Sequence, residues 1–221
     1  MKKKIFILSL VFLGYSTQGY TTPAIGKAIE INGKPDELKY ARQMATGQLK
    51  VDTPLYYNDE VFTGPKSTTR LVVDDFTANI KAAFYVYEDS KFTLAKEVVE
   101  ATGKKIVVRH TKGVLNSVIK GLQNDDELQI ETPYGTVGVR GTCVQTKVGD
   151  NSVEVASDSS TTTFNGQSLK SGTNVFSDGG KRFVVTSILD EKQCRGNKKA
   201  LDSMSPNAPL YMEETGPGNC P

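Results

Sequence analysis

The stretch Glu131–Thr142 reads ETPYGTVGVRGT, and it follows a segment in which Leu128 and Ile130 alternate with polar residues. Alternation with a period of two is typical of a strand that buries one face. Gly138 and Gly141 lie within the stretch, and glycine inside a strand marks a bend, a bulge or a close approach of another group. These residues predict β-structure in which the two glycines allow a close approach of the backbone, a bend or a bulge.

Short runs of the same kind recur along most of the chain, with turn residues between them. Asn165-Gly166 and Asp178-Gly179 are dipeptides that favour the left-handed backbone of tight hairpins. The runs are Thr69–Val73, Phe84–Tyr87, Lys105–His110, Val153–Val155, Thr163–Phe164, Val175–Phe176 and Phe183–Val185. The predicted fold class is therefore all-β, either an antiparallel β-sandwich or a short solenoid-like stack of sheets.

Two segments carry helical patterns instead. Val114–Leu122 has apolar residues at positions i, i+1, i+4, i+5 and i+8. Pro35–Met44 begins with a proline followed by two acidic residues, as the first turn of a short helix often does. From Asp190 onward the strand pattern stops, so residues 188–221 are predicted to form an irregular tail.

The chain has three cysteines, which is an odd number for an oxidising compartment. Cys194 and Cys220 bracket a segment that is poor in large apolar residues and cannot hold itself against the domain by burial. A disulfide that closes this segment would contribute roughly 3.5 kcal/mol in the chain-entropy model. We therefore expect a Cys194–Cys220 disulfide, with Cys143 as a buried free thiol.

The N-terminus has the features of a secretory signal peptide. Three lysines, Lys2–Lys4, precede a short apolar run, Ile5–Tyr15, and small and polar residues follow it. This run is about half of the ~20 residues that a membrane-spanning helix needs. We expect cleavage after Gly19, which removes residues 1–19, with Ala24 as the second choice.

The charge of the whole chain is nearly balanced, with 27 Lys and Arg residues against 25 Asp and Glu residues. Without the three N-terminal lysines the counts are 24 against 25. A nucleic-acid partner normally requires a concentrated basic face, so we expect none. Because no second apolar span follows, we expect an extracytoplasmic protein with no transmembrane span after cleavage. The periplasm is the first choice, and the cell surface or secretion are the alternatives.

The motif at Glu131–Thr142 resembles the signature of the FecR family, TP-x-x-x-x-GVRGT, first known from the periplasmic domain of iron-transport regulators. Upstream, Leu49–Gly64 (LKVDTPLYYNDEVFTG) is similar to the family's first conserved segment, and Lys112–Leu115 and Leu169–Gly172 are similar to shorter elements in the same order. The resemblance spans residues 25–187. The matching residues are Thr63, Gly64, Thr132, Pro133, Gly138, Val139, Arg140, Gly141 and Thr142.

The resemblance implies an all-β fold, so we expect Val114–Leu122 to be a strand after all. It also implies that the motif residues are structural. The iron regulators carry an anti-sigma region and a transmembrane helix before this domain, whereas here the expected signal peptide occupies that place. We therefore expect a free-standing, non-catalytic binding or sensing module that contacts protein or polysaccharide in the cell envelope. The alternative is a structural envelope component that associates with itself.

The residue inventory offers little for catalysis or metal binding. His110 is the only histidine, and one histidine with three scattered cysteines does not make a zinc set. We expect no enzyme activity and no cofactor. Arg140, if partly buried, would need a carboxylate partner such as Asp59 or Glu60. An exposed aromatic platform would favour glycan binding, and a flat unpaired edge strand would favour assembly; the candidate aromatic residues are Tyr56, Tyr57, Tyr85 and Tyr87.

Overall fold

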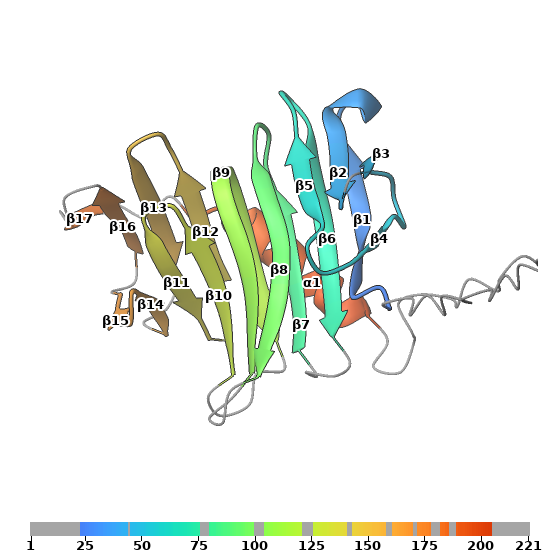
Figure 1. Cartoon of the computed structure of the whole chain (residues 1–221). Coiled ribbons are helices and arrows are strands. Elements are labelled where there is room, and N and C mark those ends of the chain that lie inside the picture. Colours follow the sequence, from blue (N-terminus) through green and yellow to red (C-terminus); the bar gives the residue numbers. More distant parts are fainter. Residues whose placement is uncertain are drawn as a thin grey trace, which may run out of the picture.

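The computed structural model describes residues 23–43, 45–75, 80–99, 104–120, 126–140, 143–157, 161–169, 172–177, 182–185 and 189–204. Two large sheets face each other, and one helix lies against one of them (Figure 1). The all-β prediction is therefore confirmed. The expected signal peptide, residues 1–19, lies outside the described residues.

Sheet A has the strand order β4-β1-β6-β7-β9-β12-β13-β16-β17, and all its neighbouring strands are antiparallel. Its strands are β1 (Gly26–Asn32), β4 (Pro54–Leu55), β6 (Thr68–Asp75), β7 (Ile80–Val86), β9 (Lys104–Lys120), β12 (Cys143–Val148), β13 (Ser152–Ser157), β16 (Gly172–Ser177) and β17 (Arg182–Val185).

Sheet B has the strand order β3-β2-β5-β8-β9-β10-β11-β14-β15. Besides β9, its strands are β2 (Leu38–Arg42), β3 (Ala45–Gln48), β5 (Glu60–Thr63), β8 (Lys91–Val99), β10 (Glu127–Thr132), β11 (Gly135–Val139), β14 (Thr162–Phe164) and β15 (Gln167–Ser168). The pair β9–β10 is parallel, and the other neighbours in this sheet are antiparallel. A short 3-10 helix, η1 (Pro35–Glu37), precedes β2, so the helix expected over Pro35–Met44 is wrong beyond its first residues.

Strand β9 belongs to both sheets. Up to Lys112 it pairs with β8 and β10 in sheet B, and from Gly113 it pairs with β7 and β12 in sheet A. Gly113 has φ +86°, and a Cβ atom there would overlap the side chain of Ser90. The strand therefore crosses from one sheet to the other at a residue that only glycine fits well.

The segment with the helical pattern is the second half of β9, so the strand implied by the family resemblance is what the structure contains up to Lys120. Leu115 and Ile119 point into the core between the sheets, whereas Val118 belongs to a second cluster on the outer face of sheet A. Both faces of this strand are buried. Because both faces are buried, the segment lacks the apolar–polar alternation of a half-buried strand. For that reason its sequence pattern looked helical.

The main core lies between the two sheets and draws on both. Because side chains alternate along a strand, the inward positions are apolar in each of the central strands. The largest fully buried side chains are Phe84, Phe92, Leu38, Leu49, Leu55, Leu71, Leu94, Ile106, Leu115, Ile119 and Leu128.

Helix α1 (Glu191–Ser203) covers the outer face of sheet A, where it packs on β6, β7 and β9 (Figure 1). The predicted irregular tail over residues 188–221 is therefore wrong for this part. Asp190 caps the helix by accepting a hydrogen bond from the Gln193 backbone N–H. Only Cys194, Ala200 and Leu201 supply buried hydrophobic surface, which is too sparse for the helix to stand out in the sequence.

The expected Cys194–Cys220 disulfide is also wrong, because Cys194 is bonded to Cys143. The two Cα atoms are 5.8 Å apart, and the residues are separated by 51 positions. The bond joins the first residue of β12 to α1 and fixes the helix on the sheet. Cys220 lies outside the described residues.

His110 connects the two sheets inside the core. It is fully buried, and its Nδ1 lies 2.8 Å from Thr146 Oγ1 on β12. Burial lowers the pKa of His110 to about 4, although a backbone hydrogen bond at Lys112 acts in the opposite direction. The neutral ring is therefore the form that the folded protein accepts.

This pKa predicts acid destabilisation. Because the unfolded chain binds the His110 proton at its ordinary pKa of about 6.5, the folded state loses stability as the pH falls from there toward 4. We expect a loss of roughly 3 kcal/mol across this window. Urea denaturation at a series of pH values measures it, with His110→Gln as the control that keeps a neutral partner for Thr146. If the two proteins lose stability equally over this range, the titration of His110 is not responsible.

Candidate functional site

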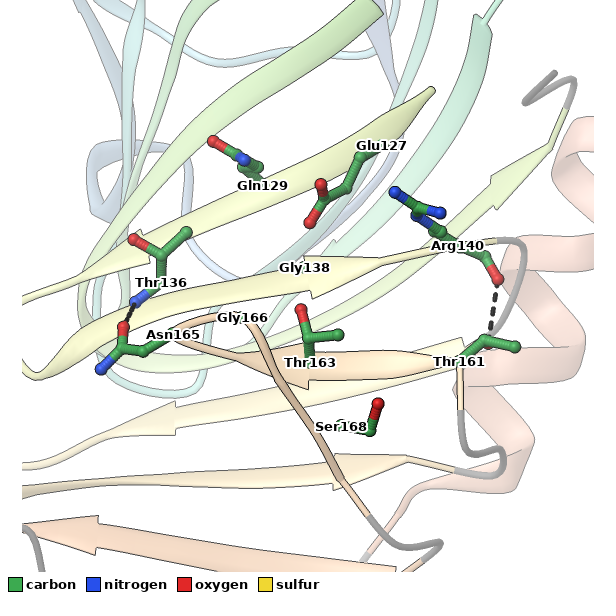
Figure 2. Close-up of a pocket in the computed structure, with 10 residues that line it drawn as sticks. All are labelled: Glu127, Gln129, Thr136, Gly138, Arg140, Thr161, Thr163, Asn165, Gly166 and Ser168. Carbon is green, nitrogen blue, oxygen red and sulfur yellow. Dashed lines mark hydrogen bonds between the residues drawn. The ribbon is translucent and has the colours of Figure 1, made fainter. Parts of the chain in front are cut away.

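A polar groove of about 660 Å³ lies on the outer face of sheet B (Figure 2). It runs across β10, β11, β14 and β15. The side chains face outward here because their neighbours, such as Leu128, Val139 and Phe164, point into the core. The lining residues are Glu127, Gln129, Thr136, Gly138, Arg140, Thr161, Thr163, Asn165, Gly166 and Ser168.

Gly138 forms the floor of the groove. It pairs with Gln129 of β10 on one side and with Thr163 of β14 on the other. A Cβ atom at this position would overlap Glu127 Oε1 and Thr163 Oγ1. The glycine thus allows the Glu127 carboxylate to lie directly against the main chain, which is the close approach expected from the motif.

Two side-chain hydrogen bonds hold the ends of the groove in place (Figure 2). Asn165 and Gly166 form the tight turn expected from the sequence, with φ values of 47° and 78°. At this end Asn165 Oδ1 accepts a hydrogen bond of 2.8 Å from the Thr136 backbone N–H. At the other end the Thr161 hydroxyl donates to the Arg140 carbonyl oxygen at 3.0 Å.

Three of the other matching motif residues form hydrogen bonds that shape the backbone. The Thr63 hydroxyl accepts a hydrogen bond of 2.9 Å from the Ser90 backbone N–H, and the Gly64 N–H donates to the Glu37 carbonyl oxygen at 2.8 Å. The Thr132 hydroxyl donates to the Gly135 carbonyl oxygen at 2.8 Å. The other motif residues are Pro133, exposed in the β10–β11 turn, Val139, which is in the core, and Gly141 and Thr142, which lie outside the described residues.

Arg140 differs from the expectation. Its side chain is exposed at the edge of the groove, so the guanidinium is not partly buried as considered from the sequence. Of the two carboxylates that the sequence suggested as partners, the buried Asp59 pairs with the partly exposed Arg42 at 2.7 Å, and Glu60 pairs with Lys91 at 2.7 Å. Arg140 therefore lies at the groove and outside the core.

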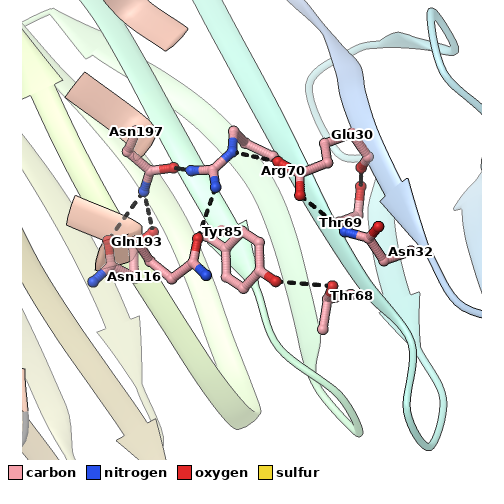
Figure 3. A network of polar contacts seen from close by, with 9 residues as sticks. All are labelled: Glu30, Asn32, Thr68, Thr69, Arg70, Tyr85, Asn116, Gln193 and Asn197. Carbon is pink, nitrogen blue, oxygen red and sulfur yellow. Dashed lines mark hydrogen bonds and ion pairs between the residues drawn. The ribbon is translucent and has the colours of Figure 1, made fainter. Parts of the chain in front are cut away.

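Helix α1 covers the central part of the opposite face of the sandwich. On sheet A, Arg70 of β6 is 7% exposed and its guanidinium contacts helix α1 (Figure 3). It donates to Gln193 Oε1 at 2.7 Å and to Asn197 Oδ1, and it pairs with Glu30 at 2.8 Å. Although partial burial opposes it, hydrogen bonding from Arg70 and Asn32 lowers the pKa of Glu30. This network packs α1 against the part of sheet A that β6, β7 and β9 form.

The tyrosines that would have formed an aromatic platform are engaged in packing. Tyr85 is 8% exposed and stacks on Arg70. The Tyr87 hydroxyl donates to Asp190 Oδ2 at 2.7 Å, and its pKa is raised by burial and by this hydrogen bond. Tyr56 and Tyr57 are half-buried, and Arg42 lies over the Tyr56 ring.

Within the part of the chain that the structure describes, no three His, Cys, Asp or Glu side chains gather as a metal site. The same residues contain no helix long and apolar enough to cross a bilayer. The groove was not predicted as a unit. The signal for it was present in the polar positions that alternate with core residues around the motif, namely Glu127, Gln129, Thr136 and Thr163. The pairing of β11 with β14, which completes the groove, cannot be read from local pattern.

No known protein family and no curated protein match this chain. Two solved structures that resemble it are crystal structures of "a putative anti-sigma factor" from Parabacteroides distasonis ATCC 8503. One has a TM-score of 0.39 and 10% identity, over 53% of this chain and 56% of that chain. The other has a TM-score of 0.36 and 11% identity, over 48% and 51%. This chain spans about half the length of each, and similarity of this extent establishes neither its family nor its activity.

Proposed function

We propose that this protein is an extracytoplasmic, non-catalytic binding module of the FecR type, which contacts a protein or polysaccharide of the cell envelope through the groove on sheet B. The observation that carries the proposal is the position of the groove. It is built around Gly138 and Arg140 of the TP-x-x-x-x-GVRGT motif, on the face of the sandwich that α1 leaves open.

Two features support an extracytoplasmic location. The Cys143–Cys194 disulfide fixes α1 on sheet A, and structural disulfides persist mainly in oxidising compartments. The basic and apolar pattern of residues 1–19 is that of an export signal.

The absence of catalysis is supported by the environment of the titratable groups. General acid–base chemistry needs a group with a suitable pKa that reaches the substrate. His110 is in the core between the sheets, away from the groove. Among the described residues that line the groove, Glu127 is the one carboxylate, whereas glycoside hydrolysis usually uses two.

The test is capture of envelope material by the immobilised mature protein. Ser168→Trp places a bulky side chain on the exposed edge strand β15 and should block the groove, so we expect capture to fall at least tenfold. Thr46→Trp is the matched control, because Thr46 is also exposed on an edge strand of sheet B, β3, outside the groove. Equal capture by both variants and the wild type would contradict the proposal.

A further inference from the structure

The lining of the groove indicates what kind of ligand fits it. Among the described residues, every one that lines the groove is polar or glycine, and none has an aliphatic or aromatic side chain. Small-molecule sites are usually lined mainly by apolar side chains with a few polar groups. Since a buried polar group without a partner destabilises a complex, the ligand must offer hydrogen-bonding groups to the polar side chains that line the groove. A lipid tail or an apolar side chain does not satisfy this condition.

The main-chain hydrogen-bonding groups at the floor of the groove are already paired with neighbouring strands. Strand β11 is paired with β10 along one side and with β14 along the other, and Gly138 lies between Gln129 and Thr163. A peptide that binds by adding a strand needs an unpaired main-chain edge, and the floor at β11 does not offer one. What the groove presents is side-chain hydroxyl and amide groups, including those of Gln129, Thr163 and Ser168. These groups both donate and accept hydrogen bonds, as sugar hydroxyls also do.

The charge of the lining is balanced. Among the lining residues that the structure describes, Glu127 is the single carboxylate and Arg140 the single guanidinium. An anionic polymer would find one cation and one anion in the groove, and therefore no net attraction. The volume of about 660 Å³ lies within the range of ~300–1,000 Å³ that holds small ligands.

We propose that the groove binds a neutral oligosaccharide, through hydrogen bonds from Gln129, Thr163 and Ser168 and without stacking on an aromatic ring. This proposal rests on the proposed function and specifies its ligand.

The experiment is calorimetric titration of the full mature protein with short neutral oligosaccharides of hexose and N-acetylhexosamine, and with uronic-acid and sulfated oligosaccharides of the same length. We expect binding of at least one neutral oligosaccharide and weaker binding of its anionic counterparts. Gln129→Ala should weaken the binding about tenfold, the effect of roughly one hydrogen-bonded group. Gln48→Ala is the matched control, since Gln48 is exposed on β3 at the other edge of sheet B, and it should bind as the wild type does.

Three results would overturn the inference: no neutral oligosaccharide binds, only the anionic ones bind, or Gln129→Ala and Gln48→Ala bind equally well. Capture of envelope material by the Ser168→Trp and Thr46→Trp variants separates these failures from a failure of the proposed function. If capture still depends on the groove, the binding module remains and its ligand is of another class. If capture does not depend on the groove, both proposals are wrong.

Discussion

Replacing Cys143 and Cys194 together by serine is expected to lower the free energy of unfolding by about 4 kcal/mol. The bond closes a loop of 51 residues, and the chain-entropy model gives about this value for a loop of that length. The bond also holds α1 on sheet A, where only a few apolar side chains pack. Urea denaturation of the double variant against the wild type measures the difference.

The control for this prediction is Cys220→Ser, which keeps the Cys143–Cys194 bond and should leave the free energy of unfolding unchanged. Peptide mapping without reductant should find one linked pair of peptides, containing Cys143 and Cys194. A linked peptide that joins Cys194 to Cys220 would contradict the structure and restore the pairing expected from the sequence.

Arg70→Ala should lower the free energy of unfolding by about 3 kcal/mol, nearly as much as the loss of the disulfide. The substitution leaves the side-chain oxygen Oδ1 of the fully buried Asn197 without its Arg70 donor. A buried polar group without a partner costs about 1–3 kcal/mol. It also removes the ion pair with Glu30 and the bond to Gln193, whose loss adds to this penalty. Because two of the lost bonds reach α1, hydrogen exchange in the helix should become faster.

Arg109→Ala is the matched control for Arg70→Ala. Arg109 also pairs with a glutamate, Glu131, at 3.0 Å, but the two side chains are 52% and 43% exposed. Exposed pairs of this kind contribute at most about 1 kcal/mol. The Arg70 network would have no special role if the two alanine variants were equally stable and their helices exchanged at the same rate.

The sequence predicted the features that depend on local pattern. The alternation of Leu128 and Ile130 with polar residues identified β10, and Asn165-Gly166 identified a hairpin turn. Close approach was one of the possibilities that the sequence left open for Gly138, and the Glu127 carboxylate lies against it. In each case the physical cause acts between residues that are close along the chain or alternate in a strand.

The predictions that were wrong concern features that depend on contacts between segments distant in the sequence. The strand β9 looked helical because both of its faces are buried, one by the core and one by α1. The helix itself escaped notice because it is held by a disulfide and by the polar side chains of Gln193 and Asn197 more than by an apolar stripe. The cysteine pairing was wrong for the same reason, since composition does not reveal that Cys143 faces the helix.

The central claim is that the groove on sheet B is the contact surface of this protein in the cell envelope. Its most direct test is photo-cross-linking in intact cells, with a photoreactive side chain in place of Ser168 in the groove or of Thr46 outside it. We predict that the chain with the probe at position 168 forms a cross-linked adduct and that the chain with the probe at position 46 does not. Adducts from position 46 with none from position 168 would contradict the claim.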